Sequence, residues 1–212
     1  MKKMGKAEAS AGIQIKPYFT QNGVHPFDGV EWEVRAAEIK DFKTGEVTFR
    51  QENLEFPKSW SQRATDIVAS KYFRGHLGSP KREHSVKQLV GRIVNTIASW
   101  GKKTNYFASA EDAQTFSNEL SYLLTNQMVA FNSPVQFNMG IRRNPQCSAC
   151  FINSVDDSMD SIMRLAKTEA TIFKGGSGSG VNLSKIRASC ESLAVGGFAS
   201  GPVSFMRGYD SF

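Results

Sequence analysis

The chain has 212 residues, enough for one large domain or two small ones, and its 40% hydrophobic and 22% charged residues are ordinary for a globular protein. The formal net charge of +6 comes from 26 basic residues scattered among 20 acidic ones, which does not form the dense basic stripe of a nucleic-acid groove. No apolar run approaches the roughly 20 residues of a membrane span, and no hydrophobic segment follows the basic start Met1–Lys6. The sequence therefore predicts neither a membrane partner nor a secretory signal, and three cysteines fit a reducing cytoplasm better than a disulfide scaffold.

Residues 1–55 have the character of strands and loops. Val30–Arg35 alternates apolar and polar side chains, which is typical of a half-buried strand. Val47–Arg50 continues the alternation after a turn around Gly45. The pattern predicts a β-hairpin across Gly45.

Residues 56–128 have a helical pattern and predict a small helical domain. Ser59 is placed to cap a first helix that runs to Tyr72. The clearest helix begins with the capping box of Ser85 and Gln88, carries one apolar stripe and ends at Gly101. A third helix is expected after Ser109, which can cap it.

Residues 129–212 combine short apolar segments in loop-like surroundings, including Val135–Phe137, with a single helix. This helix is predicted to begin at Asp157 or Ser158 and to end near Phe173, between strand-like segments at Ser148–Asn153 and Val181–Ser184. A glycine-rich stretch joins the helix to the second strand. A strand, a helix, a glycine loop and a strand in this order predict an α/β barrel or sheet.

Cys147 and Cys150 are three residues apart, which allows redox chemistry, metal binding or neither. A zinc site normally needs four ligands, and Cys190 and the three histidines do not stand at ligand spacing. No metal site is therefore predicted. A thioredoxin-like thiol would precede a helix, whereas strand-like residues Phe151 and Ile152 follow this pair. On spacing alone, two small buried residues are the favoured interpretation.

Two stretches of small residues lie close together in the sequence. Lys174–Gly180 holds four glycines in seven residues, which lets a backbone approach a ligand and offer N–H groups to phosphate. It lacks the spacing of a Walker loop or a dinucleotide-binding loop, so a flexible turn is an equally good interpretation. Gly196–Pro202 is the second stretch. Two such stretches in one region favour a pocket lined by backbone.

Three polar residues near these loops have both a plain and a functional interpretation. Asp157 and Ser158 stand at a helix start, where capping is the usual role, although a carboxylate there can also accept a hydrogen bond from a sugar hydroxyl. Arg187 is at a position that is most often a surface residue and occasionally a phosphate clamp. The residues alone favour the plain roles.

In combination, these segments resemble the adenosylcobalamin-dependent (class II) ribonucleotide reductases, from about residue 28 to the last residue. The matching segments are Phe56–Gln62, Val68–Gly75, Asn132–Val135, Phe137–Asn138, Pro145–Ile152, Asp157–Met159, Gly176–Gly178, Asn182–Ser184, Ile186–Arg187 and Ala199–Arg207. Two positions depart from the family: Gln136 stands where a tryptophan is frequent, and Lys174-Gly175 where an aromatic residue often precedes the glycines.

The resemblance implies an α-helical N-terminal domain followed by a ten-stranded α/β barrel made of two five-strand halves. This chain would hold the helical domain and the beginning of the first half-barrel, residues 129–212, so the barrel would be incomplete. The implied function is reduction of ribonucleotides to deoxyribonucleotides for DNA synthesis by thiyl-radical chemistry. The implied cofactor is adenosylcobalamin, with contacts mostly outside this chain, and thioredoxin or another dithiol would reduce the disulfide that forms.

By match with the family, Cys150 corresponds to the first of two reducing cysteines, and Cys147 is a flanking cysteine. The positions that match substrate contacts are Ser133, Ala149, Cys150 and Gly178. The positions that match the site where a deoxynucleotide effector tunes substrate choice, at a dimer interface, are Asp157, Ser158 and Arg187. The radical cysteine and the partner of Cys150 are expected beyond residue 212, so the isolated chain should not turn over.

We therefore expect the N-terminal part of a ribonucleoside-diphosphate reductase that acts with a complementary C-terminal chain. A non-catalytic nucleotide-binding or regulatory fragment, which keeps only the surface around Asp157 and Arg187, is the alternative. A degenerate fragment without function is a third interpretation.

Overall fold

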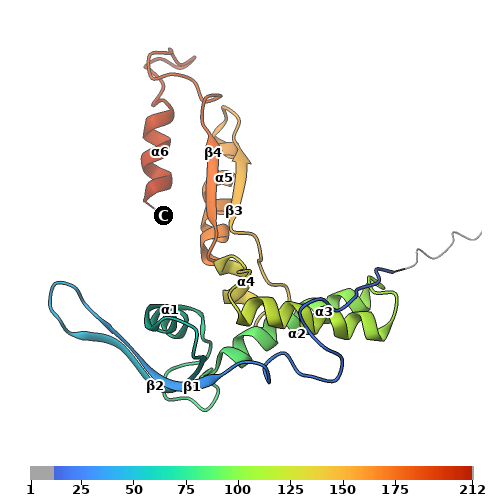
Figure 1. Ribbon diagram of the computed structural model, residues 1–212. Coiled ribbons are helices and arrows are strands. Elements are labelled where there is room, and N and C mark those ends of the chain that lie inside the picture. Colours follow the sequence, from blue (N-terminus) through green and yellow to red (C-terminus); the bar gives the residue numbers. More distant parts are fainter. Residues whose placement is uncertain (1–11, 212) are drawn as a thin grey trace, which may run out of the picture. The chain divides into compact units, whose positions relative to one another are not determined.

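A computed structural model describes residues 12–211, so the basic start Met1–Lys6 and Phe212 lie outside the described residues. The chain forms two compact units: the first ends at Phe131 and the second begins at Asn132. Figure 1 shows the elements of both units with their labels. The described residues 12–55 and the helical residues 56–128 both belong to the first unit.

The first unit opens with a β-hairpin, as the alternation of side chains predicted. Strands β1 (Trp32–Lys40) and β2 (Val47–Pro57) are antiparallel, with Trp32 opposite Pro57 and Lys40 opposite Val47. Gly45 has a φ of 72°, in the left-handed region that suits glycine in a turn. The inner face of the hairpin contributes Ala37, Leu54 and Phe56, all fully buried, to the core of this unit.

The first helix begins two residues later than the sequence predicted. Helix α1 (Gln62–Ile67) continues as the π-helical turn η1 (Val68–Tyr72), and the capping side chain is that of Ser61, whose hydroxyl accepts a hydrogen bond from Ala64 N. Ser59 is not the cap because the chain first turns on itself, with Trp60 N donating to Pro57 O at 3.0 Å. The indole Nε1 of Trp60 donates to Thr125 O at 2.8 Å. The tryptophan thus fixes where the helix can start.

The two long helices of the first unit are α2 (Val86–Lys103) and α3 (Ala110–Thr125). The capping box of Ser85 and Gln88 is present, and Ser109 caps α3, so both predicted starts are confirmed. Helix α2 runs two residues past its predicted end at Gly101. A Cβ atom on Gly101 would lie 2.5 Å from the ring of Phe107, so this glycine permits close packing instead of ending the helix.

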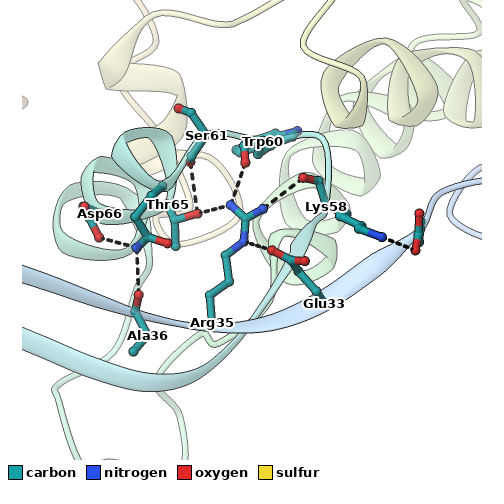
Figure 2. A network of polar contacts seen from close by, with 10 residues as sticks. Glu33, Arg35, Ala36, Lys58, Trp60, Ser61, Thr65 and Asp66 are labelled. Atoms are coloured by element: carbon teal, nitrogen blue, oxygen red, sulfur yellow. Dashed lines mark hydrogen bonds and ion pairs between the residues drawn. The ribbon is translucent and has the colours of Figure 1, made fainter.

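One arginine ties the hairpin to the start of α1, as Figure 2 shows. The guanidinium of Arg35 donates to Trp60 O at 2.7 Å, to Thr65 Oγ1 at 2.9 Å and to Lys58 O at 3.0 Å. It also pairs with Glu33. A side chain with this many partners, only 11% of it exposed, acts as a structural staple within the first unit.

The second unit contains a parallel β-α-β arrangement, which confirms the predicted order of strand, helix and strand. Its elements are α4 (Ser133–Asn138), β3 (Cys150–Ser154), α5 (Met159–Lys174), β4 (Gly178–Asn182) and α6 (Pro202–Asp210). β3 and β4 pair in parallel, from Cys150 opposite Gly178 to Ser154 opposite Asn182. Helix α5 contacts both strands (Figure 1). The two-stranded sheet is open in the described part of this unit.

Two local predictions for this unit are wrong. Val135–Phe137 lies inside helix α4, which begins after the Asn132 cap with Pro134 in its first turn, so it is not a segment in a loop. The loop formed by the glycine stretch is shorter than predicted, because β4 already begins at Gly178.

No helix among residues 12–211 is long and apolar enough to cross a membrane.

The core of the second unit lies around α5. It consists of Val155, Ile162, Leu165 and Ile186, with Val181, Leu183, Phe205 and Tyr209 packed against them. The hydroxyl of Tyr209 donates to Ile162 O at 3.1 Å, which attaches α6 to α5.

Candidate functional site

Cys150 lies at the start of β3, directly opposite Gly178 at the start of β4. Gly178 N donates to Ala149 O at 2.7 Å, which closes the beginning of the two strands. A Cβ atom on Gly178 would lie 3.7 Å from the Cys150 sulfur, so the glycine leaves open space beside the thiol. Ala149, Cys150 and Gly178, three of the predicted substrate contacts, are thus neighbours. We call this surface the Cys150 face.

The fourth predicted contact, Ser133, is the first residue of helix α4, and Asn138 is the last. Asn138 is buried, and its Nδ2 donates to Pro134 O and Gln146 O, both at 2.9 Å, and to Gly175 O at 3.0 Å. The helix that carries Ser133 is therefore joined to the segment before Cys150 and to the end of α5.

The glycine stretch has packing reasons for its composition. A Cβ atom on Gly175 would lie 2.4 Å from Nε2 of Gln146, and Gly176 has a φ of 83°. Gln146 Nε2 donates to Ile172 O at 3.1 Å and to the hydroxyl of Ser177. That hydroxyl donates in turn to Ser148 O at 2.5 Å. Gly175 and Gly176 are explained by these contacts without a phosphate.

The three cysteines differ in exposure, and all are free thiols. Cys150 and Cys190 are exposed, whereas Cys147 is partly buried, with its thiol 3.6 Å from Pro145 O. Burial raises the pKa of Cys147. Because the thiolate is the nucleophile in thiol–disulfide exchange, Cys147 is the less suited of the pair to redox chemistry. No cluster of three metal-binding side chains occurs among residues 12–211.

Asp157, Ser158 and Arg187 meet at a second place in this unit. Arg187 Nε donates to Asp157 Oδ2 at 2.6 Å, and Arg187 N donates to Asp157 Oδ1 at 3.2 Å. The hydrogen bond from Arg187 lowers the pKa of the Asp157 carboxyl below its ordinary value of 3.8. Ser158, not Asp157, caps α5 by accepting from Ser161 N. Asp157 is therefore available for pairing with an arginine 30 residues away.

These three residues line a cavity of about 240 Å³, which we call the Asp157 cavity. The remaining lining residues are Met159, Ile162, Ile186, Leu193, Ala199, Ser200, Gly201 and Phe205. The stretch Gly196–Pro202 thus contributes to the Asp157 cavity. The stretch Lys174–Gly180 instead lies next to Ala149 and Cys150. The pocket predicted from two stretches is therefore present only in part, because Ala199, Ser200 and Gly201 line this cavity and no residue of Lys174–Gly180 does.

Sequence reasoning missed a buried acid behind the strands. Glu169 on α5 is 5% exposed, and its Oε1 accepts from Ser179 Oγ at 2.8 Å. Ser179 in turn accepts from Asn153 Nδ2 at 2.8 Å. Sequence reasoning also assigned no role to Asn138, Gln146 or Ser177. Their partners lie up to 37 residues away, so only the matched segments around them gave any signal.

Comparison with known proteins places this arrangement in a family. A family model described as class II vitamin B12-dependent ribonucleotide reductase matches residues 33–127. A model of the ribonucleotide reductase barrel domain matches residues 148–212. The vitamin B12-dependent ribonucleotide reductase of Streptomyces coelicolor is 53% identical over 204 residues, which cover 96% of this chain and 21% of that protein. The chain belongs to the class II, vitamin B12-dependent ribonucleotide reductases.

Two further relatives support the same family. The vitamin B12-dependent ribonucleotide reductase of Rhodopirellula baltica is 43% identical over 95% of this chain and 22% of that protein. The vitamin B12-dependent ribonucleoside-diphosphate reductase of Thermoplasma acidophilum is 41% identical over 81% of this chain and 20% of that protein. The chain spans about a fifth of the length of these reductases. The Asp157 cavity and residues 149, 150 and 178 all lie within the segment that matches the reductase barrel domain.

Proposed function

We propose that this chain forms part of a reductase that converts ribonucleotides to deoxyribonucleotides for DNA synthesis, with Cys150 as one of the two thiols that supply electrons. The observation that carries the proposal is the exposed Cys150 thiol beside the open side of Gly178, in a segment that matches the reductase barrel. Three free cysteines fit the reducing cytoplasm in which such an enzyme would act.

In the proposed reaction, the bond between ribose C2′ and its hydroxyl breaks, the oxygen leaves as water, and a C2′–H bond forms. Two thiols together give up two electrons and two protons and become a disulfide. Cys150 is one of them, and we place the second, together with the cysteine that carries the thiyl radical, outside this chain. A complementary reductase segment would supply both, and thioredoxin or another dithiol would then reduce the disulfide.

We propose that the substrate contacts are Ser133, Ala149, Cys150 and Gly178. Because Gly178 has no side chain, a ribose can approach the Cys150 sulfur from that side. We further propose a diphosphate substrate, in line with the name of the Thermoplasma acidophilum relative.

We propose that the Asp157 cavity binds a deoxynucleotide effector that tunes substrate choice, at the interface of a homodimer. The Asp157 carboxylate can accept a hydrogen bond from a sugar hydroxyl. The bond from Arg187 to Asp157 uses Nε, so both terminal nitrogens of the guanidinium have no hydrogen-bond partner in the described part of the chain. They are free to contact phosphate. Calorimetry with deoxynucleotides tests this, and binding without any reductase activity would favour the non-catalytic regulatory module instead.

The relatives are named for vitamin B12, and we assign adenosylcobalamin, which supplies radical chemistry, to the whole reductase. The described residues of this chain do not fit it. The Asp157 cavity holds about 240 Å³ and an apolar cavity in the first unit about 370 Å³. Pockets for drug-sized ligands measure roughly 300–1,000 Å³, so the first cavity lies below this range and the second at its lower end, and a corrin is larger than either can enclose. We therefore assign no residue of this chain to the cofactor.

The deciding experiment uses the intact reductase that contains this sequence, with adenosylcobalamin, thioredoxin and ribonucleoside di- or triphosphates. Cys150→Ser should abolish multiple turnover, because no disulfide can then form at this position. Cys190→Ser is the matched control, since Cys190 is also exposed, and should keep turnover within about twofold. Wild-type protein that reduces no ribonucleotide would refute the function, and a fully active Cys150→Ser variant would refute the role of Cys150.

A further inference from the structure

We propose that Asn138, Gln146 and Ser177 are positioning residues that hold the Cys150 thiol in place against Gly178. We call these three residues the amide clamp. The inference rests on the proposed function, because it concerns how the redox thiol is presented. Its structural basis is a set of hydrogen bonds that converge from three segments on the start of β3 and the start of β4.

Asn138 provides the first part of the clamp. It is 4% exposed, and its Nδ2 is within hydrogen-bond distance of three carbonyl oxygens, those of Pro134, Gln146 and Gly175. An amide nitrogen has two hydrogens, so at least one of them is shared between acceptors. Only one of the three carbonyls belongs to the asparagine's own helix. The side chain therefore binds α4, the segment before Cys150 and the end of α5 together.

Gln146 and Ser177 extend the clamp to the strands. Gln146 Nε2 donates to Ile172 O near the end of α5 and to the Ser177 hydroxyl. Ser177 is 6% exposed, and its hydroxyl donates to Ser148 O at 2.5 Å. Ser148 stands two residues before Cys150, and Ser177 directly precedes Gly178. The clamp therefore fixes both strands one step before the bond from Gly178 N to Ala149 O.

This placement predicts a kinetic effect with a particular form. None of the three clamp residues is among the proposed substrate contacts, so loss of a single clamp hydroxyl should change nucleotide binding less than it changes the position of the Cys150 sulfur. The clamp sets where the sulfur lies, and a displacement of about 1 Å from a reactive geometry can cost roughly 100-fold in rate. We therefore expect kcat to fall while KM for the nucleotide changes little. A residue that served only general stability would not produce this separation.

Two serines on either side of Gly178 provide a matched comparison. Ser177→Ala removes the clamp hydroxyl. Ser179→Ala makes the same chemical change two residues later and breaks the hydrogen-bond chain of Ser179 with Glu169 and Asn153, which is separate from the clamp. Both variants lose two side-chain hydrogen bonds among partly or fully buried groups. They differ in their partners: Ser177 binds Gln146 and Ser148 in the segment before Cys150, whereas Ser179 binds Asn153 and Glu169.

The experiment measures both variants in the intact reductase holoenzyme by hydrogen exchange at the Gly178 amide and by steady-state kinetics. Ser177→Ala should exchange about three- to tenfold faster at Gly178, the range set by loss of the one bond that joins the two strands, from Ser177 Oγ to Ser148 O. Its kcat should fall about tenfold or more with KM within twofold. Ser179→Ala should leave exchange at Gly178 unchanged and kcat within about threefold. Equal behaviour of the two variants, or a raised KM at unchanged kcat, would overturn the proposal.

Gln146→Met, which keeps a side chain of similar length without the donor, repeats the test if Ser177→Ala fails to fold. Should both clamp variants unfold while Ser179→Ala folds, the clamp is a determinant of folding and the positioning role is refuted. The exchange measurement needs no activity. An inactive wild-type enzyme that still shows the exchange contrast would therefore count against the proposed function and leave the clamp geometry in place.

Discussion

The sharpest structural prediction concerns Gly175→Ala. Gly175 has φ and ψ angles of −85° and −4°, which any residue can adopt, so alanine meets no backbone strain. Its Cβ atom would instead lie 2.4 Å from Nε2 and 2.5 Å from Cδ of Gln146. Atoms do not approach so closely without a bond, and Gln146 must therefore move away.

The cost follows from what Gln146 would lose. Its Nε2 donates to Ile172 O and to Ser177 Oγ, and a hydrogen bond contributes about 0.5–1.5 kcal/mol net to stability. Loss of both costs about 1–3 kcal/mol. Replacement of a glycine by alanine restricts the unfolded chain and recovers about 0.4–1 kcal/mol. We expect a net loss between about 0 and 2.6 kcal/mol for Gly175→Ala, near the middle of that range.

A double-mutant cycle isolates this contact. Urea unfolding is compared for the wild type, Gly175→Ala, Gln146→Ala and the double variant, and is followed at NMR signals of Val155 and Ile162 because all three tryptophans lie in the first unit. Once Gln146 is shortened, the collision is gone, and Gly175→Ala should be neutral or slightly stabilising. The interaction energy should therefore equal the cost of the lost hydrogen bonds, about 1–3 kcal/mol.

Gly91→Ala in helix α2 is the control, because no atom lies within 4 Å of a Cβ built there. It should stabilise the first unit by about 0.5–1 kcal/mol. An equal cost of Gly175→Ala with and without Gln146 would refute the reasoning, since the loss would then not come from this contact.

Two further predictions concern the two candidate sites. Gly178→Ala places a methyl group 3.7 Å from the Cys150 sulfur, which is an ordinary contact, so thermal stability should hardly change. Iodoacetamide labelling of Cys150 and reductase turnover should both fall. Unchanged labelling would contradict access to the sulfur from the side of Gly178. Arg187→Gln should raise the Asp157 carboxyl pKa toward 3.8 in an NMR titration, while the Asp41 pKa, lowered by backbone N–H groups of Thr44 and Lys43, stays constant as reference. Because pairing lowers the folded-state pKa of Asp157, the pair stabilises the folded state at pH values above the ordinary pKa. This stabilisation is lost as the pH falls through the lowered pKa. An Asp157 pKa that does not change in Arg187→Gln would contradict this pairing.

The features that the sequence predicts well are those with local causes. The capping box of Ser85 and Gln88, the Ser109 cap and the helix start at Ser158 depend on side chains within four residues of the groups they bind. The turn of the hairpin likewise follows from Gly45, which adopts the φ of 72° that suits glycine. Each of these can be recognised without knowledge of any distant residue.

The failures have distant causes. Ser59 satisfies the local preference for a helix cap, but the turn that displaces it is held by Trp60, whose indole binds Thr125 from 65 residues away. The glycine stretch was equally consistent with a phosphate loop or a turn, because Gly175 is explained by Gln146, 29 residues earlier. Such partners are defined only once the chain is folded.

Gly175 and Gly178 are three residues apart and differ in what a side chain would meet. Gly175 is favoured by packing, since a Cβ atom there would lie 2.4 Å from Gln146 and displace it. Gly178 is not: it is exposed, its φ lies outside the left-handed region, and a Cβ atom would make only ordinary contacts at 3.7 and 3.8 Å. Packing within this chain therefore gives no reason for a glycine at 178. Access from outside to the Cys150 sulfur would explain a glycine at this position, in agreement with the proposed substrate at the Cys150 face. The open side of Gly178, and not the number of glycines, is therefore the informative feature of the stretch.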